Sequence, residues 1–484
     1  MTQRSVQQVL GGWGNCPVET CHVTSPESLD ALSETVSRGE QSDYIARGLG
    51  RAYGDSALNA DRGVILTRRL NRLLAFDPQS GLLECESGVS FADLARVMVP
   101  RGWFFPTTPG TKFVTVGGAI AADVHGKNHH RDGTFGNFVR RLTLLTASGE
   151  VLACSPQENA DVFWATVGGM GLTGVILTAQ IALMKIETAY FDVSYQRTAH
   201  LDETLERFAA TDHEYRYSVA WIDCLASGRS LGRSVLMLAN DGRADQLPRR
   251  LAQRPLDVPA RLPLSVPFQM PGFALNPWSV KAFNALFYAK NKDRSTLVDY
   301  NTFFYPLDGV QHWNRIYGRR GFIQYQALFP RETSRSGLVK LLEKIARSRG
   351  ASFLAVLKTS GEAGPGMLSY LHAGHTLALD LPNTGADLRR LVRDLDRILL
   401  DEGGRLYAAK DALTSAEVFA AMYPRLDEFR QVKARIDPKM KFVSSQARRL
   451  GIVEAVCPKP FLSSAPIPAL HDRFSTCSRH AAAG

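Results

Sequence analysis

PGTKFVTVGGAIAADVHGKNHHRDGTFGN, residues 109–137, is the stretch of this sequence that decides the fold. Its run of small residues is followed by Lys127, Asn128 and the pair His129 and His130, and it already contains His125. Glycines let the backbone approach a bulky ligand closely and let consecutive N–H groups point at a phosphate. A dense group of His, Lys and Asn beside such a cradle predicts a cofactor with chemistry next to it, and makes polar loop residues without a role the less favoured alternative.

Two further glycine-rich loops belong to the same pattern. ARGLGRAYGDS, residues 46–56, follows a predicted strand, and GGMGLTGVI, residues 168–176, leads into another. Each alone is weak evidence, because a structural turn explains it equally well. Three such loops at strand edges indicate a dinucleotide site, with Arg47 or Arg51 adding charge beside a pyrophosphate. Glycine spacing does not by itself separate FAD from another dinucleotide.

Length and composition place the chain among ordinary globular proteins. Its 484 residues are enough for two or three domains with a large core. Hydrophobic residues make up 45% and charged residues 21%, as is ordinary for a globular protein. We found no apolar run of the roughly 18 residues that a membrane span needs, and no secretory signal, so we expect a cytoplasmic protein. The seven cysteines are scattered without zinc-site spacing, so we expect reduced thiols and no metal.

The formal net charge of +10 favours an anionic partner. The basic residues are spread along the chain, without a Lys/Arg block or a helix-turn-helix pattern. We therefore expect an anionic small molecule or a lipid headgroup as ligand, and no nucleic acid.

The remaining pattern predicts an α+β fold. Short strands and helices alternate up to about residue 187. Beyond it, strand patterns such as YRYSVAWID alternate with amphipathic helices such as DLRRLVRDLDRILLDEGG, which favours an antiparallel sheet with helices on one face. Residues 251–275 are rich in proline and apolar residues, and indicate either an ordered surface loop or a mobile flap that touches an apolar substrate.

The three loops together resemble the FAD-binding domain of the vanillyl-alcohol oxidase or p-cresol methylhydroxylase (PCMH) type. A closer resemblance rests on ARGLGRAYGD, HGKNHH, FIQYQ, GGRLYAAKD and MYPRLDEF, which occur in order over roughly residues 11–450. These motifs are similar to those of the decaprenylphosphoryl-β-D-ribose oxidase family. The resemblance implies a two-domain fold with an FAD-binding domain in residues 1–187 and 405–450, an antiparallel-sheet substrate domain in 188–404 with a flexible loop at 251–275, and a disordered extension at 451–484.

The resemblance also implies how the flavin is bound. Many relatives attach FAD covalently through a histidine of the first loop, and Arg51 stands at that place here. We therefore expect non-covalent FAD. The cofactor-binding residues implied are Ala46, Arg47, Gly48, Leu49, Gly50, Arg51, Ala52, Tyr53, Gly54, Asp55, Gly110, Thr115, Val116, Gly117, Gly118, Ala122, Asp123, His125, Ile176 and Tyr407.

The reaction implied is oxidation of a ribofuranose 2′-hydroxyl to a ketone, which needs a base for the hydroxyl proton. Lys410 is the first choice, followed by His125, Tyr53 and Lys127. Gln324 and Gln326 alternate in FIQYQ and should share one face of a strand, where two amides can bind sugar hydroxyls. Tyr305, Lys358 and Trp221 are further substrate-binding candidates, although Trp221 fits a core position equally well. Where mycobacterial members have a cysteine, this chain has Ala378, which implies a pocket of altered shape.

The substrate implied is a polyprenylphosphoryl sugar, with peripheral contact to the inner face of a membrane and an NAD(P)H-dependent short-chain reductase as partner for the second half of an epimerisation. The nearest alternative is an alditol or aldonolactone oxidase of the same fold, which predicts a covalent-flavin histidine and an HWGK-like motif. A second alternative is a polyanion-binding protein with a degenerate flavin fold.

Overall fold

The structure is a computed structural model that describes residues 4–259, 264–271, 276–348 and 354–453. The expectations for the extension beyond residue 453 and for part of the Pro-rich segment lie outside these residues. Residues up to Val453 form one compact unit. None of its described helices is long and apolar enough to cross a bilayer.

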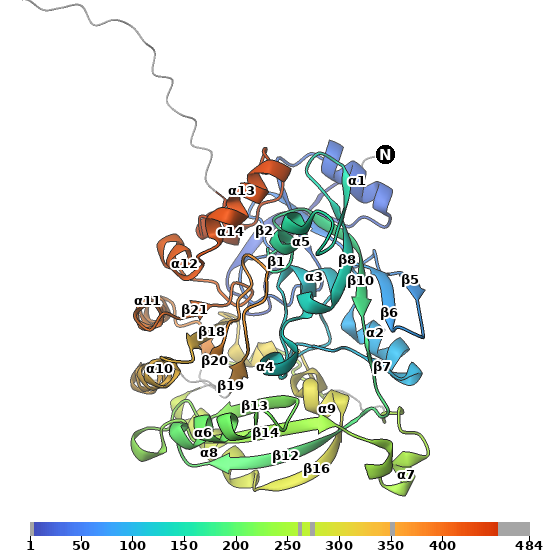
Figure 1. Cartoon of the computed structure of the whole chain (residues 1–484). Coiled ribbons are helices and arrows are strands. Elements are labelled where there is room, and N and C mark those ends of the chain that lie inside the picture. Colours follow the sequence, from blue (N-terminus) through green and yellow to red (C-terminus); the bar gives the residue numbers. More distant parts are fainter. Residues whose placement is uncertain (1–3, 260–263, 272–275, 349–353, 454–484) are drawn as a thin grey trace, which may run out of the picture. The chain divides into compact units, whose positions relative to one another are not determined.

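The N-terminal part contains two sheets with helices between their strands (Figure 1). The first has the order β1-β2-β4-β3 and mixes antiparallel and parallel pairs; the second, β5-β6-β10-β8-β9, is antiparallel. Their strands are β1 Val6–Gly11, β2 Val18–Thr24, β3 Tyr44–Arg47, β4 Gly63–Leu66, β5 Leu73–Phe76, β6 Leu82–Glu86, β8 Val139–Leu145, β9 Val151–Cys154 and β10 Val175–Ala182. The associated helices are α1 Leu29–Arg38, α2 Phe91–Met98, α3 Val116–Ala121, α4 His129–Asp132 and α5 Ala160–Thr166, and β7 Trp103–Phe104 pairs with β11 Met184–Lys185.

Strands from residue 190 onward form one large antiparallel sheet, as the alternating pattern predicts. Its order within the described chain is β16-β12-β14-β13-β19-β20-β18-β21, and every neighbouring pair is antiparallel. The strands are β12 Tyr190–Thr198, β13 Tyr217–Ile222, β14 Ser234–Asp241, β16 Arg294–Asp299, β18 Phe322–Pro330, β19 Ala355–Ser360, β20 Gly374–Pro382 and β21 Arg405–Leu406.

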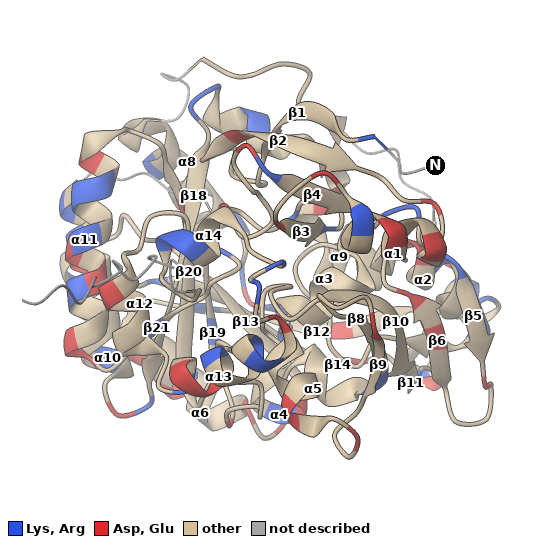
Figure 2. Ribbon diagram, turned by 90° about the horizontal axis from the view of Figure 1, so that it is seen from above, with Lys and Arg blue, Asp and Glu red and all other residues tan. Residues whose placement is uncertain are grey.

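Three helices cover one face of this sheet, and the candidate site lies on the other face. The covering helices are α6 Leu201–Thr211, α10 Ser334–Ser348 and α11 Ala386–Asp401 (Figure 1). On β18 the Tyr325 hydroxyl donates to Asp396 of α11, at 2.9 Å. Gln324 and Gln326 therefore point to the opposite face, because side chains alternate along a strand. Acidic and basic residues alternate along the outer side of α11 (Figure 2), as is usual for a helix with one solvated face.

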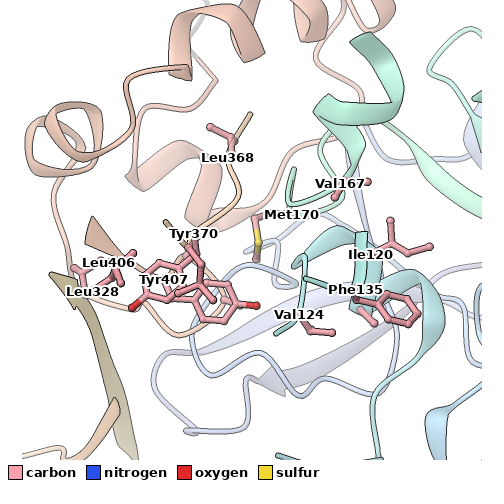
Figure 3. Close-up of a cluster of buried hydrophobic side chains, with 14 of the residues drawn as sticks. Ile120, Val124, Phe135, Val167, Met170, Leu328, Leu368, Tyr370, Leu406 and Tyr407 are labelled. Carbon is pink, nitrogen blue, oxygen red and sulfur yellow. The ribbon is translucent and has the colours of Figure 1, made fainter. Parts of the chain in front are cut away.

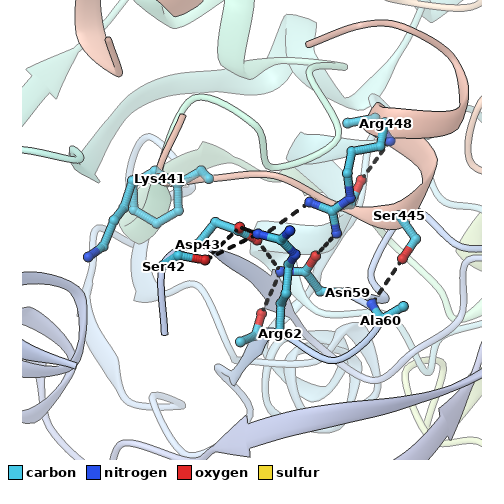
Figure 4. A network of polar contacts seen from close by, with 12 residues as sticks. Ser42, Asp43, Asn59, Ala60, Arg62, Lys441, Ser445 and Arg448 are labelled. Atoms are coloured by element: carbon cyan, nitrogen blue, oxygen red, sulfur yellow. Dashed lines mark hydrogen bonds and ion pairs between the residues drawn. The ribbon is translucent and has the colours of Figure 1, made fainter. Parts of the chain in front are cut away.

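The last described helices return to the N-terminal sheet. They are α12 Ala416–Met422, α13 Leu426–Ile436 and α14 Ser445–Arg449. The Tyr44 N–H of β3 donates to the Lys441 carbonyl at 2.7 Å, and the Val443 N–H donates back to the Tyr44 carbonyl. Arg448 of α14 reaches Asp43 and Asn59, as Figure 4 shows. These bonds support the assignment of residues 405–450 to the N-terminal domain, which remains a proposal.

One continuous core joins the two parts. Ile120 of α3, Phe135, Tyr407 and Leu328 of β18 belong to one cluster of buried side chains (Figure 3). The division at residues 187 and 404 therefore does not separate two cores, and beyond its second boundary β21 Arg405–Leu406 still pairs with β18 of the large sheet. We keep the division as a proposal. The remaining elements are α7 Arg249–Ala252, α8 Pro277–Lys290, α9 Tyr300–Phe304, and β15 Leu264–Ser265, which pairs in parallel with β17 Val310–Gln311. The described parts of the Pro-rich segment thus include a short helix and a paired strand.

Candidate active site

A cavity of about 1020 Å³ lies between the three glycine-rich loops and the face of the large sheet opposite α10 and α11, and residues of α8 and α9 also line it. The residues predicted for the site that line it are Ala46, Gly48, Leu49, Gly50, Arg51, Ala52, Tyr53, Gly110, Thr115, Gly117, Gly118, Ala122, His125, Lys127, Ile176, Trp221, Gln324, Gln326, Lys358, Tyr407 and Lys410. Six predicted residues do not line it: Arg47, Gly54, Asp55, Val116, Asp123 and Tyr305. The fold thus brings together residues more than three hundred positions apart.

The first loop offers free backbone donors. Among the described residues, no protein acceptor binds the N–H groups from Gly48 to Ala52. Gly50 has φ +64°, and a Cβ there would lie 2.3 Å from the Arg47 guanidinium, so only glycine fits. Consecutive N–H groups around a residue in the left-handed conformation form an anion-binding concavity. This loop is therefore the best place for a pyrophosphate.

The second loop differs from its prediction in one respect. Thr115 caps α3, and its hydroxyl accepts the Gly118 N–H at 3.2 Å. The N–H groups of Val116 and Gly117 donate to the carbonyls of Val89 and Ser87. These groups are already bound to protein oxygens, so the GG segment provides close approach rather than donors for a phosphate. Val116 itself is a core residue.

Three buried polar atoms on the cavity wall have no partner in the described chain: Arg51 Nε, Ser87 Oγ and His125 Nδ1. The Arg51 guanidinium stacks on Trp13 at 4.1 Å. Buried polar atoms are nearly always hydrogen-bonded, so unpaired ones around a large cavity indicate that a polar ligand completes them. The cavity and its donors therefore fit a dinucleotide cofactor.

The predicted residues outside the cavity hold the loops in place. The Arg47 guanidinium donates to the carbonyls of Gly11 and Ala57, at 2.7 and 3.2 Å, and is not available to a pyrophosphate. Asp55 forms a two-point ion pair with Arg449, which also binds Asp411. A Cβ at Gly54 would lie 2.0 Å from the Asp411 carbonyl oxygen, so the first loop packs directly on the segment that carries Lys410.

Two more predicted residues, Asp123 and Tyr305, do not line the cavity but bind residues near it. The buried Asp123 carboxylate accepts the Gly136 N–H and the Ser369 hydroxyl. The Tyr305 hydroxyl lies 2.6 Å from that of Thr108, which lines the cavity. Tyr305 therefore supports the wall rather than forming it.

Three lysines reach the cavity, and burial lowers the pKa of each. The pKa is lowered to about 7 for Lys410, to about 7 for Lys127 and to about 8 for Lys358. The Lys127 ammonium donates to the Phe303 carbonyl and lies over the Phe303 ring, and Lys358 Nζ is 3.5 Å from the Gly126 carbonyl. Lys410 and Lys127 are therefore partly neutral near pH 7, whereas Lys358 stays mostly charged.

Lys410 has a different environment. Its Nζ lies 3.9 Å from the centre of the Tyr53 ring and makes no hydrogen bond to the part of the chain that is described. The pKa of Tyr53 is well above its usual value because the phenol is buried, so Tyr53 stays protonated and is a poor base. Lys410 is thus the free amine next to a phenol.

Asp380 was not predicted from the sequence. It lies opposite Gln324 in the β18–β20 pair and accepts the Gln324 amide at 2.6 Å and the Tyr317 hydroxyl at 3.3 Å. Burial raises the pKa of Asp380 to about 7, and its charge in turn raises that of Lys410. An acidic residue inside the apolar strand HTLALDLP is the signal that could have revealed it.

His125 is held by Gln326. The Gln326 amide nitrogen lies 3.0 Å from His125 Nε2 and 3.3 Å from the Thr376 hydroxyl, which the amide donates to. Burial, with Lys358 nearby, keeps the pKa of His125 well below its usual value, so the ring is neutral. An amide donor at Nε2 implies a proton on Nδ1, the atom without a partner.

The other histidines of the opening stretch have structural contacts. His129 Nδ1 accepts the Gly361 N–H at 3.0 Å, and His130 Nε2 lies 3.1 Å from the Tyr215 carbonyl. Neither lines the cavity. No cluster of three or more potential metal ligands occurs in the described residues.

Comparison with known proteins agrees with this geometry. Residues 21–155 match the FAD-binding domain family, and residues 382–450 match the D-arabinono-1,4-lactone oxidase family. The decaprenylphosphoryl-β-D-ribose oxidase of Mycolicibacterium smegmatis is 40% identical over 450 residues, which cover 92% of this chain and 97% of that protein.

The chain belongs to the decaprenylphosphoryl-β-D-ribose oxidase family. A more distant relative is the L-gulono-1,4-lactone dehydrogenase of Mycobacterium tuberculosis, 23% identical over 90% of this chain and 98% of that protein. The segment of this chain that carries Lys410 lies within the match to the lactone oxidase family. The prediction of an FAD-dependent oxidoreductase with an α+β fold is therefore confirmed.

FAD fits the residues present. The free N–H groups of residues 48–52 suit its pyrophosphate, and the unpaired atoms of Arg51, Ser87 and His125 face the same cavity. Ala122, Ile176 and Tyr407 provide apolar or aromatic surface there. The Tyr407 hydroxyl donates to the Ala122 carbonyl at 2.6 Å, which fixes its ring beside that of His125.

Proposed function

We propose that this protein oxidises the 2′-hydroxyl of a polyprenylphosphoryl-β-D-ribofuranose to the 2′-keto sugar, with non-covalently bound FAD. The proposal rests on the cavity, which combines three features. In the described chain the backbone N–H groups of the first loop are free to donate to a phosphate, and two amide side chains lie on one face of β18. The pKa of Lys410 is lowered to about 7. The relative that is 40% identical is a decaprenylphosphoryl-β-D-ribose oxidase, which supports the same substrate class.

The chain's own residues handle the sugar and the proton. Bound FAD supplies the hydride acceptor. Lys410 takes the proton of the 2′-hydroxyl, because its amine is free and its pKa is lowered to about 7. Gln324 and Gln326 position the sugar hydroxyls from the face of β18, each oriented by its own partner, Asp380 or His125.

Lys127 and Lys358 serve the substrate phosphate in this proposal. Both lysines line the cavity, and in the described chain their ammonium groups contact backbone carbonyls, at Phe303 and Gly126. An arriving phosphate raises the pKa of both lysines and replaces lost hydration with charge-assisted hydrogen bonds. Trp221, which lines the cavity and contacts the Phe287 ring at 4.6 Å between ring centres, forms an apolar wall on the side of the lipid.

Two partners follow from the reaction. The keto sugar must be reduced on the opposite face to complete an epimerisation, so an NAD(P)H-dependent short-chain reductase is the proposed consumer of the product. A polyprenyl phosphate resides in a membrane, so we also propose peripheral contact with a membrane surface.

The test is anaerobic mixing of the purified flavoprotein with candidate substrates while the visible absorbance of oxidised flavin is recorded. A polyprenylphosphoryl-β-D-ribofuranose should reduce the flavin, so that its visible absorbance is lost after mixing. Xylitol and an aldonolactone should leave it oxidised. Bleaching by the lactone alone would favour the alternative raised by the match of residues 382–450, and a colourless protein would favour the polyanion-binding alternative.

A further inference from the structure

Exposed aromatic side chains are concentrated in one stretch of the described chain. Leu264, Phe268, Trp278, Phe283 and Leu286 are 72%, 62%, 82%, 45% and 72% exposed, and no other Phe or Trp in the described residues is as exposed. The remaining exposed large apolar residues are Val and Leu on β1, β2, β5, β9 and the first loop. A concentration of exposed apolar and aromatic side chains of this kind indicates an interaction site.

Helix α8 presents most of this surface. Its inner side is fixed to the large sheet, because Asn284 donates to Asp223 at 2.7 Å and the Phe287 ring packs against that of Trp221. Its outer side is apolar along the whole helix, since residues spaced three and four apart are all exposed: Trp278, Ala282, Ala285, Leu286 and Ala289. The helix is therefore held in place, and its outer apolar face is exposed among the described residues.

The charged residues of α8 itself are all basic. The sequence contains no acidic residue between Asp257 and Asp293. Lys281, Lys290 and Lys292 are exposed at the edge of the apolar face. A helix with Trp and Leu outward and lysines at its border is typical of binding in the interface of an anionic bilayer.

The same surface borders the cavity. Phe283 and Phe287 of α8 line it, and so does Val310 of β17. β17 pairs with β15, which carries Leu264. A lipid-linked molecule lying in a bilayer under α8 would therefore have a direct apolar path to the sugar site.

We propose that the outer face of α8, with Leu264 and Phe268, docks on an anionic phospholipid bilayer and delivers the lipid-linked substrate to the cavity. The delivery step rests on the proposed function, whereas the docking step does not. The lysines attract the surface, and Trp278 and Leu286 insert among the headgroups.

Flotation of the full-length flavoprotein with vesicles tests the docking. Phosphatidylcholine vesicles containing phosphatidylglycerol should carry the protein, and pure phosphatidylcholine vesicles should carry much less. The double variant Trp278→Gln/Leu286→Gln should weaken binding at least tenfold. Lys281→Glu/Lys290→Glu should weaken binding to the anionic vesicles by more than about fivefold for each lysine, because each charge changes sign.

The matched control is Val9→Gln/Val151→Gln, which removes two exposed apolar side chains from β1 and β9. It should bind vesicles like the unchanged protein. Equal vesicle binding by the Trp278/Leu286 variant would overturn the proposal. So would a dimer that this variant dissociates in size-exclusion chromatography without any vesicle binding, because the face would then join two copies of the chain.

Flavin bleaching by a water-soluble, short-chain phosphoryl ribose separates this proposal from the proposed function. Vesicle binding without bleaching would refute the function alone. Bleaching without vesicle binding would refute the docking surface alone. Bleaching by a long-chain substrate in vesicles should fall in the Trp278/Leu286 variant, while bleaching by the short-chain substrate should not change.

Discussion

At the scale of single residues, the contacts of each ammonium group distinguish the three cavity lysines. Lys127 and Lys358 face backbone carbonyls, whereas Lys410 faces the ring of a protonated phenol. A carbonyl partner favours the charged amine, and an amine without an acceptor is the one that can take up a proton. This difference selects Lys410 as the base.

Lys410→Met should lower the rate of flavin reduction by about 10²- to 10⁴-fold while flavin content is unchanged. Lys410→Arg is the matched control that keeps the charge and should be equally slow, because a guanidinium does not lose its proton. In the unchanged protein the rate should rise with pH through about 7, as the Lys410 amine becomes neutral. Rapid-mixing spectroscopy across pH checks both, and a full rate in Lys410→Met would exclude this role.

Asp380 is a positioning residue in this scheme. Asp380→Ala removes a buried acceptor to which the Gln324 amide and the Tyr317 hydroxyl donate, which should lower the free energy of unfolding by about 3 kcal/mol. Asp380→Asn keeps an acceptor and should cost less. Because the Asp380 charge raises the pKa of Lys410, both variants should move the rise in rate to lower pH. Urea unfolding and the pH profile measure the two effects, and an unchanged profile would contradict the coupling.

At the scale of elements, one arginine binds carboxylates from two segments of the site. Arg449 of α14 binds Asp55 behind the first glycine loop and Asp411 next to Lys410. Both carboxylates are buried, so their charges depend on this one partner. The cofactor loop and the base are therefore held in register by a helix that comes from the end of the described chain.

Arg449→Met should lower the free energy of unfolding by about 3 kcal/mol or more, because it leaves two buried carboxylates unpaired. It should also weaken FAD retention, since the first loop loses its support. Arg347→Met, which breaks an exposed pair with Glu343 on α10, is the control and should change neither. Denaturant unfolding and flavin absorbance after gel filtration measure the two effects. Equal stability of Arg449→Met and Arg347→Met would refute the prediction.

At the scale of the whole molecule, the cofactor cavity lies inside the shared core, so FAD should stabilise the entire described unit. FAD at about one hundred times its Kd should stabilise the apoprotein by about 2.7 kcal/mol. With Arg51 at the usual attachment position, acid precipitation should release all of the flavin into the supernatant. A thermal melt with and without FAD and the colour of the pellet are the measurements; a yellow pellet would contradict non-covalent binding.

The sequence by itself determined the fold class, the three loops around one cavity, and the shared face of Gln324 and Gln326. These follow from local rules, namely glycine at strand edges and the two-residue period of a strand. The tertiary structure alone decided which groups remain free to act. The N–H groups of the GG segment already donate to the carbonyls of Ser87 and Val89. The Arg47 guanidinium already donates to the Gly11 carbonyl.

Asp380 shows the reverse case, in which the fold adds a functional residue. Its register opposite Gln324 depends on the pairing of β18 with β20, two strands separated by α10 and β19. A hydrogen bond has one donor and one acceptor, and the distant segment that supplies the second member is known only once the chain is folded. The sequence therefore determined which chemical groups are present, and the tertiary structure decided which of them are already bound.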